Sequence, residues 1–274
     1  METTRPRWIE RLRTLAQYLE TVGWRATLGL AGLRLRSAFG LAAPRTVQIR
    51  PAGVRFPLTM RTGNSSDGAV FWEIFQQRMY APLADLRAPK LILDLGANVG
   101  YGSVYFLNRF PNARVVGVEP DPASAAICLR NLAPYGDRAR VVVGAVWPEK
   151  ARLVLSRGAF GDGREWATQV RERAAGDNGE DVEGWDVASL IDLAGTERAD
   201  LLVIDIEGSE RALFGHPARA WLERVDNICI ELHGSGCREA FQGALAGYEH
   251  ELETRPHLTI CRNLRRQAQL ARVS

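Results

Sequence analysis

The chain has 274 residues, of which 46% are hydrophobic and 24% charged, and its formal net charge is +3. These values are typical of a globular protein with one large domain, or one domain and an appendage. The net charge is too small to indicate a nucleic-acid partner, and we expect none. No apolar run reaches the roughly 18 residues that a membrane-spanning helix needs, and the N-terminus lacks the apolar segment of a signal peptide.

The cysteines indicate the redox compartment. The four form neither a CxxC pair nor a zinc-type pattern with histidine. Three of them lie in or beside apolar runs, which is typical of buried free thiols in a reducing environment. Together with the missing signal peptide, this pattern predicts a cytoplasmic protein. Its four cysteines, expected to be free thiols, are Cys128, Cys229, Cys237 and Cys261.

Residues 1–45 are expected to form a basic, amphipathic helical appendage. The first 50 residues hold nine arginines against three glutamates, a local charge of +6 that leaves about −3 for the rest. Apolar residues recur at helical spacing between residues 8 and 39. Such a helix packs on the main domain or on a second subunit, as in a homodimer, or makes peripheral contact with an anionic membrane. Glu10 and Glu20 dilute the basic face and favour packing.

Residues 46–88 are expected to form a small hairpin and a helix that lead into the core. The segment "TVQIRPAGVRFPLTMRT" alternates apolar and polar residues around a "PAG" break, which predicts two short strands. The segment "GNSSDGAVFWEIF" then predicts an aromatic-rich helix with Asp67 as its N-cap.

Residues 89–264 show a repeated strand, loop and helix rhythm, which predicts a Rossmann-like parallel sheet with helices on both faces. A Gly-rich, charged stretch at 156–184 is too polar for the sheet core, so we expect an insertion or a mobile lid. An antiparallel pair is expected at the end, in "YEHELETR" and "HLTICRN". The expected parallel strands are Leu91–Leu95, Arg114–Val118, Arg140–Val146, Leu201–Ile206 and Asn227–Leu232, and the clearest helix is Pro122–Leu132.

Acidic residues follow four of these strands. In an open parallel sheet, ligands bind outside the carboxyl ends of the strands, so side chains at these positions are candidates for a site. Packing explains any one of them, but four together favour function. The residues are Asp94, Glu119, Asp205 with Glu207, and Glu231 with His233.

The loop in "LILDLGANVGYG" distinguishes between nucleotide cofactors. In the dinucleotide fingerprint G-x-G-x-x-G, the second glycine makes room for a pyrophosphate, and here Asn98 takes its place. Asp94 would repel a phosphate but hold an ammonium group. Glu119 lies 23 residues after Gly96, close to the sequence spacing at which a carboxylate accepts hydrogen bonds from both hydroxyls of a ribose. These features together favour S-adenosylmethionine, with the glycines allowing the backbone to approach it closely.

Three ordered blocks resemble the class I S-adenosylmethionine-dependent methyltransferases, and more closely their FkbM-type branch. The blocks are "DLGANVGYGSVYFLNR", "VVGVEPDPASAAICLRNL", and "LLVIDIEGSERALFG" with "ICIELHG", and the leading "LTMRTGNSSDGAVFWEIF" is also similar. The resemblance implies a doubly wound α/β fold whose seven-stranded sheet is mostly parallel with an antiparallel last strand. Relatives usually have a lysine where this chain has Val203.

The resemblance also implies roles for individual residues. Asp94, Gly96, Ala97, Asn98 and Gly100 would lie along the methionine end of the cofactor and Glu119 on the ribose, with Pro120, Asp121 and Ala145 against the adenine. Asp205, Glu207 and Glu210 would lie beside the transferable methyl group, and Glu231 and His233 would reach the same pocket.

Deprotonation of an acceptor hydroxyl needs a base. His233 is the preferred candidate, followed by Asp205 and Glu207; a histidine satisfied by backbone at a strand end is an equal alternative for His233. A divalent cation on Asp205, Glu207 and Glu231 ranks lower, because the chain has no D-x-D-x-D loop, and we expect no metal.

The resemblance suggests O-methylation of a hydroxyl on a sugar, a glycan or a natural-product intermediate. Two alternatives remain: a nicotinamide-dependent oxidoreductase, which Asn98 argues against, and a non-catalytic S-adenosylmethionine-binding protein, for which Val203 is the only indication.

Overall fold

The computed structural model describes residues 16–17, 19–24, 26–29, 31–32, 39, 45–63, 65–156, 169–174, 177, 179–216 and 220–267. It divides into two compact units, Met1–Leu86 and Arg87–Ser274. Much of the expected N-terminal appendage, including residues 1–15, lies outside the described residues. Among the described residues, no helix has the length and apolar character needed to cross a bilayer.

The first unit contains a two-stranded antiparallel sheet and short helices. Its strands are β1 (Thr46–Ile49) and β2 (Leu58–Arg61). A helix, α2 (Asp67–Phe71), continues as one π-helical turn (Trp72–Gln76), and a 3-10 turn follows at Ala81–Leu83. Residues 19–24 and 26–29 are helical.

Asp67 is not the N-cap that the sequence predicted. Ser66 occupies that position, and Asp67 is the first residue of α2. The Asp67 carboxylate is completely buried and lies 2.7 Å from the Arg61 guanidinium. It also accepts the Arg61 backbone N–H at 2.7 Å. Asp67 therefore ties α2 to β2.

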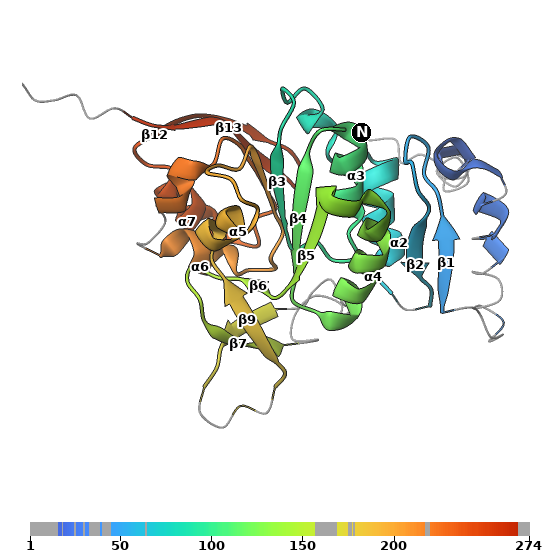
Figure 1. The fold of residues 1–274 in the computed structure, drawn as a ribbon, viewed down its shortest axis with the longest axis horizontal. Coiled ribbons are helices and arrows are strands. Elements are labelled where there is room, and N and C mark those ends of the chain that lie inside the picture. The colour runs from blue at the N-terminus through green and yellow to red at the C-terminus, as the bar shows by residue number, and fades with distance from the viewer. Residues whose placement is uncertain are drawn as a thin grey trace, which may run out of the picture. The chain divides into compact units, whose positions relative to one another are not determined.

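The second unit is built on a seven-stranded sheet with the order β12-β13-β11-β10-β3-β4-β5 (Figure 1). The five strands from β11 to β5 are parallel, and β13 pairs antiparallel with β11 and β12. This confirms the doubly wound, mostly parallel sheet with an antiparallel last strand. The strands are β3 (Leu91–Leu95), β4 (Arg114–Glu119), β5 (Ala139–Val143), β10 (Leu201–Ile204), β11 (Ile228–Ile230), β12 (Tyr248–Thr254) and β13 (Thr259–Arg266).

Helices cover both faces of this sheet. Alternate residues of β3 point to opposite faces: Leu91, Leu93 and Leu95 join the main apolar core, and Asp94 faces α3. That core also contains residues of α5, α6 and α7, so these helices share one face. The helices are α3 (Tyr101–Arg109), α4 (Pro122–Leu132), α5 (Val187–Leu193), α6 (Glu210–Gly215) and α7 (Ser235–Ala244), with 3-10 turns at Ala133–Arg138 and Ala220–Arg224.

A second, four-stranded sheet interrupts the alternation, with the order β6-β9-β7-β8. Its strands are β6 (Ala145–Val146), β7 (Arg152–Ser156), β8 (Gln169–Glu172) and β9 (Asp181–Trp185). Ala145, Leu153, Leu155 and Val182 form its small apolar core. Part of the Gly-rich stretch thus forms strands, while residues 157–168 lie outside the described part of the chain.

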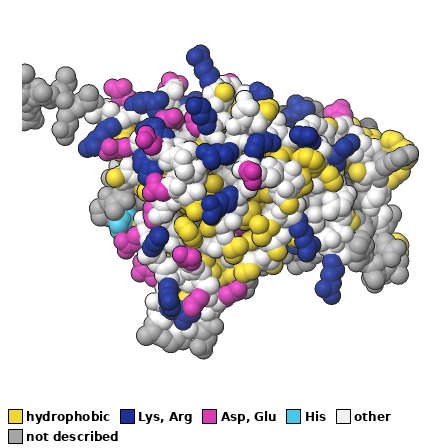
Figure 2. All heavy atoms as spheres, viewed as in Figure 1, with side chains coloured by type: hydrophobic (Ala, Val, Ile, Leu, Met, Phe, Trp, Pro, Cys, Tyr) yellow, Lys and Arg dark blue, Asp and Glu magenta, His cyan; other side chains and the backbone are white. Residues whose placement is uncertain are grey.

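Charged side chains are mixed on the face of the molecule in Figure 2, where lysines and arginines lie among acidic residues. The four cysteines are buried free thiols, as the sequence predicted.

The connectivity reverses direction between β3 and β10. The chain runs outward from β3 through β4 to β5, and then returns to pair β10 with the other edge of β3. At such a reversal the loops after the two central strands diverge, and ligands of open α/β sheets bind there. The loops after β3 and β10 are therefore the place to examine.

These two loops pack directly against each other. Gly96 has a φ of +92°, and a Cβ there would lie 1.8 Å from the carbonyl oxygen of Asp205. A Cβ at Gly100, whose φ is +83°, would lie 2.9 Å from the Cys128 sulfur in α4. The glycines were expected to let a ligand approach the backbone. At both glycines, atoms of the protein itself already lie close to the position of the missing side chain, and the approach of a ligand to this backbone stays a prediction.

We predict that Gly96→Ala lowers the free energy of unfolding by about 3–5 kcal/mol, because a left-handed alanine and a backbone clash add together. Gly195→Ala is the matched control: its φ is +67°, but no atom lies within 4 Å of its Cβ position. The control should lose only about 1–2 kcal/mol. Urea unfolding measures both, and equal losses would contradict the packing role of Gly96.

Candidate active site

Asp94 lies near the end of β3 and is almost completely buried, at 4% exposure of the whole residue. It accepts a hydrogen bond from the Ser103 hydroxyl of α3 at 2.6 Å. Burial raises the pKa of Asp94 to about 6, although the Ser103 hydrogen bonds oppose this. The carboxylate is therefore ionised at neutral pH, and a bound cation would stabilise that charge further.

Glu119, at the end of β4, is held by two loops. One carboxylate oxygen accepts the backbone N–H of Asn98 at 2.8 Å, and the other accepts that of Asp121 at 2.9 Å. Glu119 is 6% exposed. Because the carboxylate is fixed in orientation, it suits the paired hydroxyls of a ribose.

Asn98 shows an unsatisfied acceptor at the same place. Its φ is +48°, so its backbone is left-handed. Its side-chain oxygen is buried and has no hydrogen-bond partner among the described residues. A buried acceptor without a partner costs roughly 1–3 kcal/mol, so a ligand donor would relieve it.

These three side chains fit the cofactor that the sequence predicted. Asp94 and Glu119 offer carboxylate oxygens around the β3 loop, and Asn98 offers a buried amide oxygen without a partner among the described residues. S-adenosylmethionine presents donors, its ammonium group and ribose hydroxyls, and carries no phosphate. The residues therefore suit this group and disfavour an anionic dinucleotide.

Two of the other predicted cofactor residues, Asp121 and Ala145, have structural roles. Asp121 caps α4 by accepting the Ser124 backbone N–H at 2.8 Å. Ala145 is 2% exposed and packs into the core of the four-stranded sheet, so only its backbone could meet a ligand. Pro120 is half-buried between Glu119 and Asp121, and Ala97 is buried in the β3 loop. Their contacts with adenine and methionine remain predictions.

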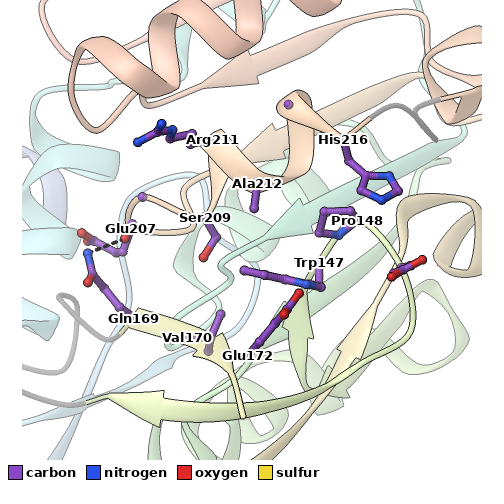
Figure 3. A pocket seen from close by; sticks show the side chains of 13 residues that line it. Trp147, Pro148, Gln169, Val170, Glu172, Glu207, Ser209, Arg211, Ala212 and His216 are labelled. Atoms are coloured by element: carbon purple, nitrogen blue, oxygen red, sulfur yellow. Dashed lines mark hydrogen bonds between the residues drawn. The ribbon is translucent and has the colours of Figure 1, made fainter. Parts of the chain in front are cut away.

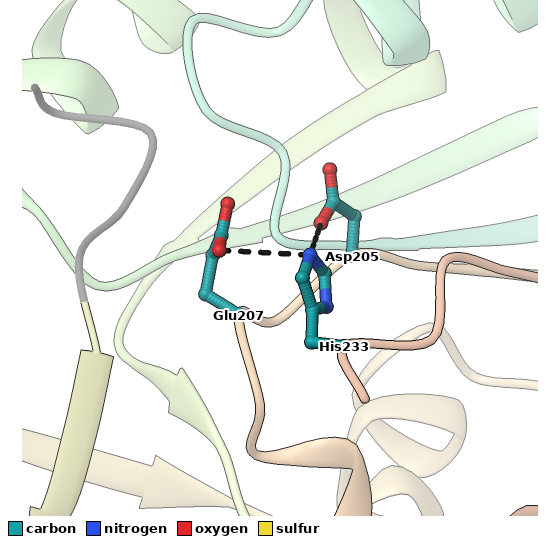
Figure 4. Close-up of side chains that lie close together, drawn as sticks. All are labelled: Asp205, Glu207 and His233. Atoms are coloured by element: carbon teal, nitrogen blue, oxygen red, sulfur yellow. Dashed lines mark ion pairs between the residues drawn. The ribbon is translucent and has the colours of Figure 1, made fainter. Parts of the chain in front are cut away.

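A second group of charged residues comes from the loops after β10 and β11 (Figure 4). The His233 Nε2 lies 3.7 Å from an Asp205 carboxylate oxygen and 3.5 Å from one of Glu207. Asp205 is also attached to the end of β3, because its backbone N–H donates a hydrogen bond to the Leu95 carbonyl at 2.9 Å. The structure thus brings the three predicted catalytic residues together beside the β3 loop.

Glu210 organises this group, and the sequence did not reveal its role. Its carboxylate is completely buried, and it lies 3.0 Å from the His233 Nδ1. It also accepts the backbone N–H groups of Ile206, at 3.1 Å, and Gly208, at 2.8 Å. The family resemblance of the block "DIEGSE" placed Glu210 beside the transferable methyl group, but the helix dipole explains an acid in the first turn of α6 more simply.

The turn that carries Glu207 is strained. Glu207 has a φ of +51° and Gly208 one of +98°, so two successive residues are left-handed. For a residue with a Cβ this conformation costs roughly 1–2 kcal/mol. Strain of this kind persists only where surrounding contacts hold it, and it is common at functional sites.

The carboxylates change the protonation of His233. Burial lowers the pKa of His233, but its hydrogen bond with Glu210 and the charges of Glu210, Asp205 and Glu207 outweigh burial and raise that pKa to about 9. The ring is therefore a cation at neutral pH.

The carboxylates themselves are harder to ionise than usual. Burial raises the pKa of Glu207 to about 7, although the His233 charge opposes this. Desolvation, followed by the charges of Glu231 and Glu207, raises the pKa of Asp205, and water moderates that effect because the Asp205 side chain is 47% exposed. Burial also raises the pKa of Glu231. Glu207 is thus close to its midpoint at neutral pH.

The same cluster has the donor atoms of a cation site. One atom each of Asp205, Glu207 and His233 lie within 4.8 Å of one another. A divalent cation there would have to displace the proton on His233 Nε2. The absence of a metal remains a prediction.

A cavity of about 650 Å³ opens beside Glu207 (Figure 3). One wall is the β10–α6 loop and α6, with Glu207, Ser209 and Ala212. The other comes from the four-stranded sheet and the segment after β6, with Trp147, Val170 and other residues. The remaining lining residues are Pro148, Glu149, Gln169, Glu172, Gly208, Arg211, Gly215 and His216.

Comparison with known proteins identifies the family. The family model "Methyltransferase FkbM domain" matches residues 94–254, more than half of the chain. Methyltransferase sdnD of Sordaria araneosa is 27% identical over 212 residues, which cover 64% of this chain and 79% of sdnD. The 2-O-methyltransferase NoeI of Sinorhizobium fredii is 32% identical over 132 residues, 44% of this chain and 54% of NoeI.

Among solved structures, methyltransferase FkbM from Methylobacillus flagellatus KT aligns with a TM-score of 0.47 and 16% identity, over 66% of this chain and 46% of that one. The chain thus spans only about half of the length of two of these three relatives. The family match covers the β3 loop with Asp94 and Glu119, the cluster of Asp205, Glu207 and His233, and the four-stranded sheet. The chain belongs to the FkbM methyltransferase family and is an S-adenosylmethionine-dependent methyltransferase.

Proposed function

We propose that the protein methylates a hydroxyl oxygen of a sugar, a glycan or a natural-product intermediate, and that Glu207 accepts the proton of that hydroxyl. The observation that carries this proposal is the convergence of Asp205, Glu207 and His233 beside the cofactor loop. The printed name of the Sinorhizobium relative, a 2-O-methyltransferase, supports an oxygen acceptor.

The protein has two tasks in such a reaction. Bound S-adenosylmethionine supplies an electrophilic methyl group on a sulfonium. The protein must orient the acceptor oxygen in line with that group, because alignment of the two reactants accounts for much of the barrier reduction. It must also take the hydroxyl proton, since a neutral alcohol is a weak nucleophile.

Glu207 suits the second task better than His233. A general base works best with a pKa near the operating pH, and the pKa of Glu207 is about 7. The pKa of His233 is about 9, so its ring already carries both protons at neutral pH and has no free lone pair to offer. In this proposal His233 stabilises the ionised carboxylates, and Asp205 remains a second acceptor of protons.

The cavity beside Glu207 suits the acceptor. Its volume of about 650 Å³ is in the range of small-molecule sites. Trp147 and Val170 offer apolar surface, while Gln169, Glu172 and Ser209 offer groups that bond hydroxyls. A ring with apolar faces and hydroxyl edges matches such a lining.

Val203 is compatible with catalysis. It is 2% exposed and lies next to Asp94 in the register of β10 and β3, on the same face. A lysine at this position, usual in relatives, would therefore stand beside Asp94. With valine, the charge of Asp94 is left for the ammonium group of the cofactor.

The cofactor assignments give one prediction. Asp94→Ala and Glu119→Ala should each weaken S-adenosylhomocysteine binding by about 1–3 kcal/mol, the scale of a lost hydrogen bond to a charged group. Isothermal titration calorimetry measures the affinities. Asp137→Ala, which removes an exposed acid far along the chain from either loop, is the control and should bind like the unmodified protein. Unchanged affinity in both test variants would contradict the proposed cofactor site.

The role of Glu207 gives a second prediction. Methyl transfer should increase as the pH rises through about 7, because the carboxylate accepts a proton only when it is ionised. Glu207→Gln should lower kcat by roughly 10²–10⁴-fold and remove this rise. The assay uses labelled S-adenosylmethionine with a panel of saccharides, phenols and aliphatic alcohols to find the acceptor.

Two measurements make this prediction decisive. S-adenosylhomocysteine binding should survive in Glu207→Gln, which separates a lost base from a lost fold. His233→Gln should still show a rise with pH if Glu207 is the base, but the rise should shift to higher pH, because the His233 charge no longer lowers the pKa of Glu207. A fully active Glu207→Gln variant would exclude Glu207 from the chemistry.

A further inference from the structure

A side chain from outside the central sheet reaches the strained turn. The Gln169 amide nitrogen, at the start of β8, donates a hydrogen bond to the backbone carbonyl of Glu207 at 2.8 Å (Figure 3). Gln169 pairs with Ser156 in the four-stranded sheet and is 38 residues away from Glu207 in sequence. The contact is therefore a tertiary link between the inserted sheet and the β10–α6 loop.

This link completes the support of the turn. Glu210 binds the N–H groups of Ile206 and Gly208, on either side of Glu207. The carbonyl of Glu207 itself is bound by Gln169. A Cβ at Gly208 would lie 3.4 Å from the Gln169 amide nitrogen, so the amide sits close against the turn. Since the left-handed conformation of Glu207 is unfavourable by itself, each of these bonds helps to hold it.

The same strand also lines the cavity. Gln169, Val170 and Glu172 of β8 face it together with Glu207. One strand thus forms part of the acceptor wall and holds the residue that would accept the proton. Displacement of β8 would move both.

We propose that Gln169 is a positioning residue, which holds the left-handed turn of Glu207 through its backbone carbonyl and thereby keeps the Glu207 carboxylate beside His233. The catalytic importance of this residue rests on the proposed function, in which Glu207 is the base. The geometry that it describes is testable without an acceptor.

The titration of His233 reports on the position of Glu207. Four carboxylates act on this ring: those of Asp205, Glu207, Glu210 and Glu231. Each negative charge favours the imidazolium, so removal of one, or its movement away from the ring, lowers the midpoint of the titration. NMR of the full-length protein follows the His233 ring across pH, with its signal assigned from His233→Gln.

The test is a double-mutant cycle. Gln169→Met keeps the length of the side chain and removes the donor, and it should lower the His233 midpoint, as Glu207→Gln does. The double variant should titrate like Glu207→Gln alone, because Gln169 acts only through Glu207. Arg171→Ala, which breaks the exposed pair with Asp177 on the same strand, is the control and should leave the midpoint unchanged.

Two results would overturn the proposal: a Gln169→Met midpoint equal to that of the unmodified protein, or full additivity in the double variant. If Gln169→Met does not fold, as judged by lost S-adenosylhomocysteine binding, Gln169→Asn decides, since its shorter amide falls short of the carbonyl and should also lower the midpoint. The titration involves no methyl transfer. Failure of Glu207 as a base would therefore appear in the activity assay, and failure of Gln169 as its support would appear here.

Discussion

The buried carboxylate of Glu210 is the interaction on which the catalytic side of the site depends. Its two oxygens join the loop after β10, through the amides of Ile206 and Gly208, to the His233 ring that follows β11. Removal of this carboxylate would leave two amides and an imidazole without their acceptor inside the protein, which is more costly than the loss of an exposed hydrogen bond. The positions of Glu207 and His233 therefore depend on one fully buried side chain.

Other carboxylates at strand ends of the sheet also accept two backbone N–H groups each. Glu119 binds the amides of Asn98 and Asp121, which belong to the loops after β3 and β4. At the opposite end, Asp200 accepts the backbone N–H groups of Lys90 and Leu91 at the start of β3. Loops at strand ends leave amides that no strand can pair, and an acid that accepts two of them satisfies the backbone and fixes the loop. Glu119 also lies beside the β3 loop, where the cofactor is expected.

Electrostatics and strain act together around Glu207. Burial makes its charge unfavourable and raises its pKa, while the His233 cation offsets only part of that effect. The resulting pKa near neutrality requires Glu207 to remain close to that ring, and its left-handed backbone remains in place only because Glu210 and Gln169 bind the turn from both sides. The inserted sheet thus has a clear place in the proposed function: it shapes the acceptor cavity and supports the residue that faces it.

The sequence by itself determined the parallel sheet, the acidic residues that follow its strands and the family. It did not determine every strand end, since the predicted strand Arg140–Val146 is divided between β5 and β6, which belong to different sheets. The strand Leu91–Leu95 and the helix Pro122–Leu132 have the predicted bounds, because apolar runs and capping residues are local signals. Only the tertiary structure decided the roles of Gly96, Glu210 and Gln169 and the charge of His233. Gly96 is required by a carbonyl 109 residues away, and the pKa of His233 depends on carboxylates from a different loop. Such contacts join segments that are distant in sequence, and their distances and burial exist only once the parallel sheet has brought the strand ends together.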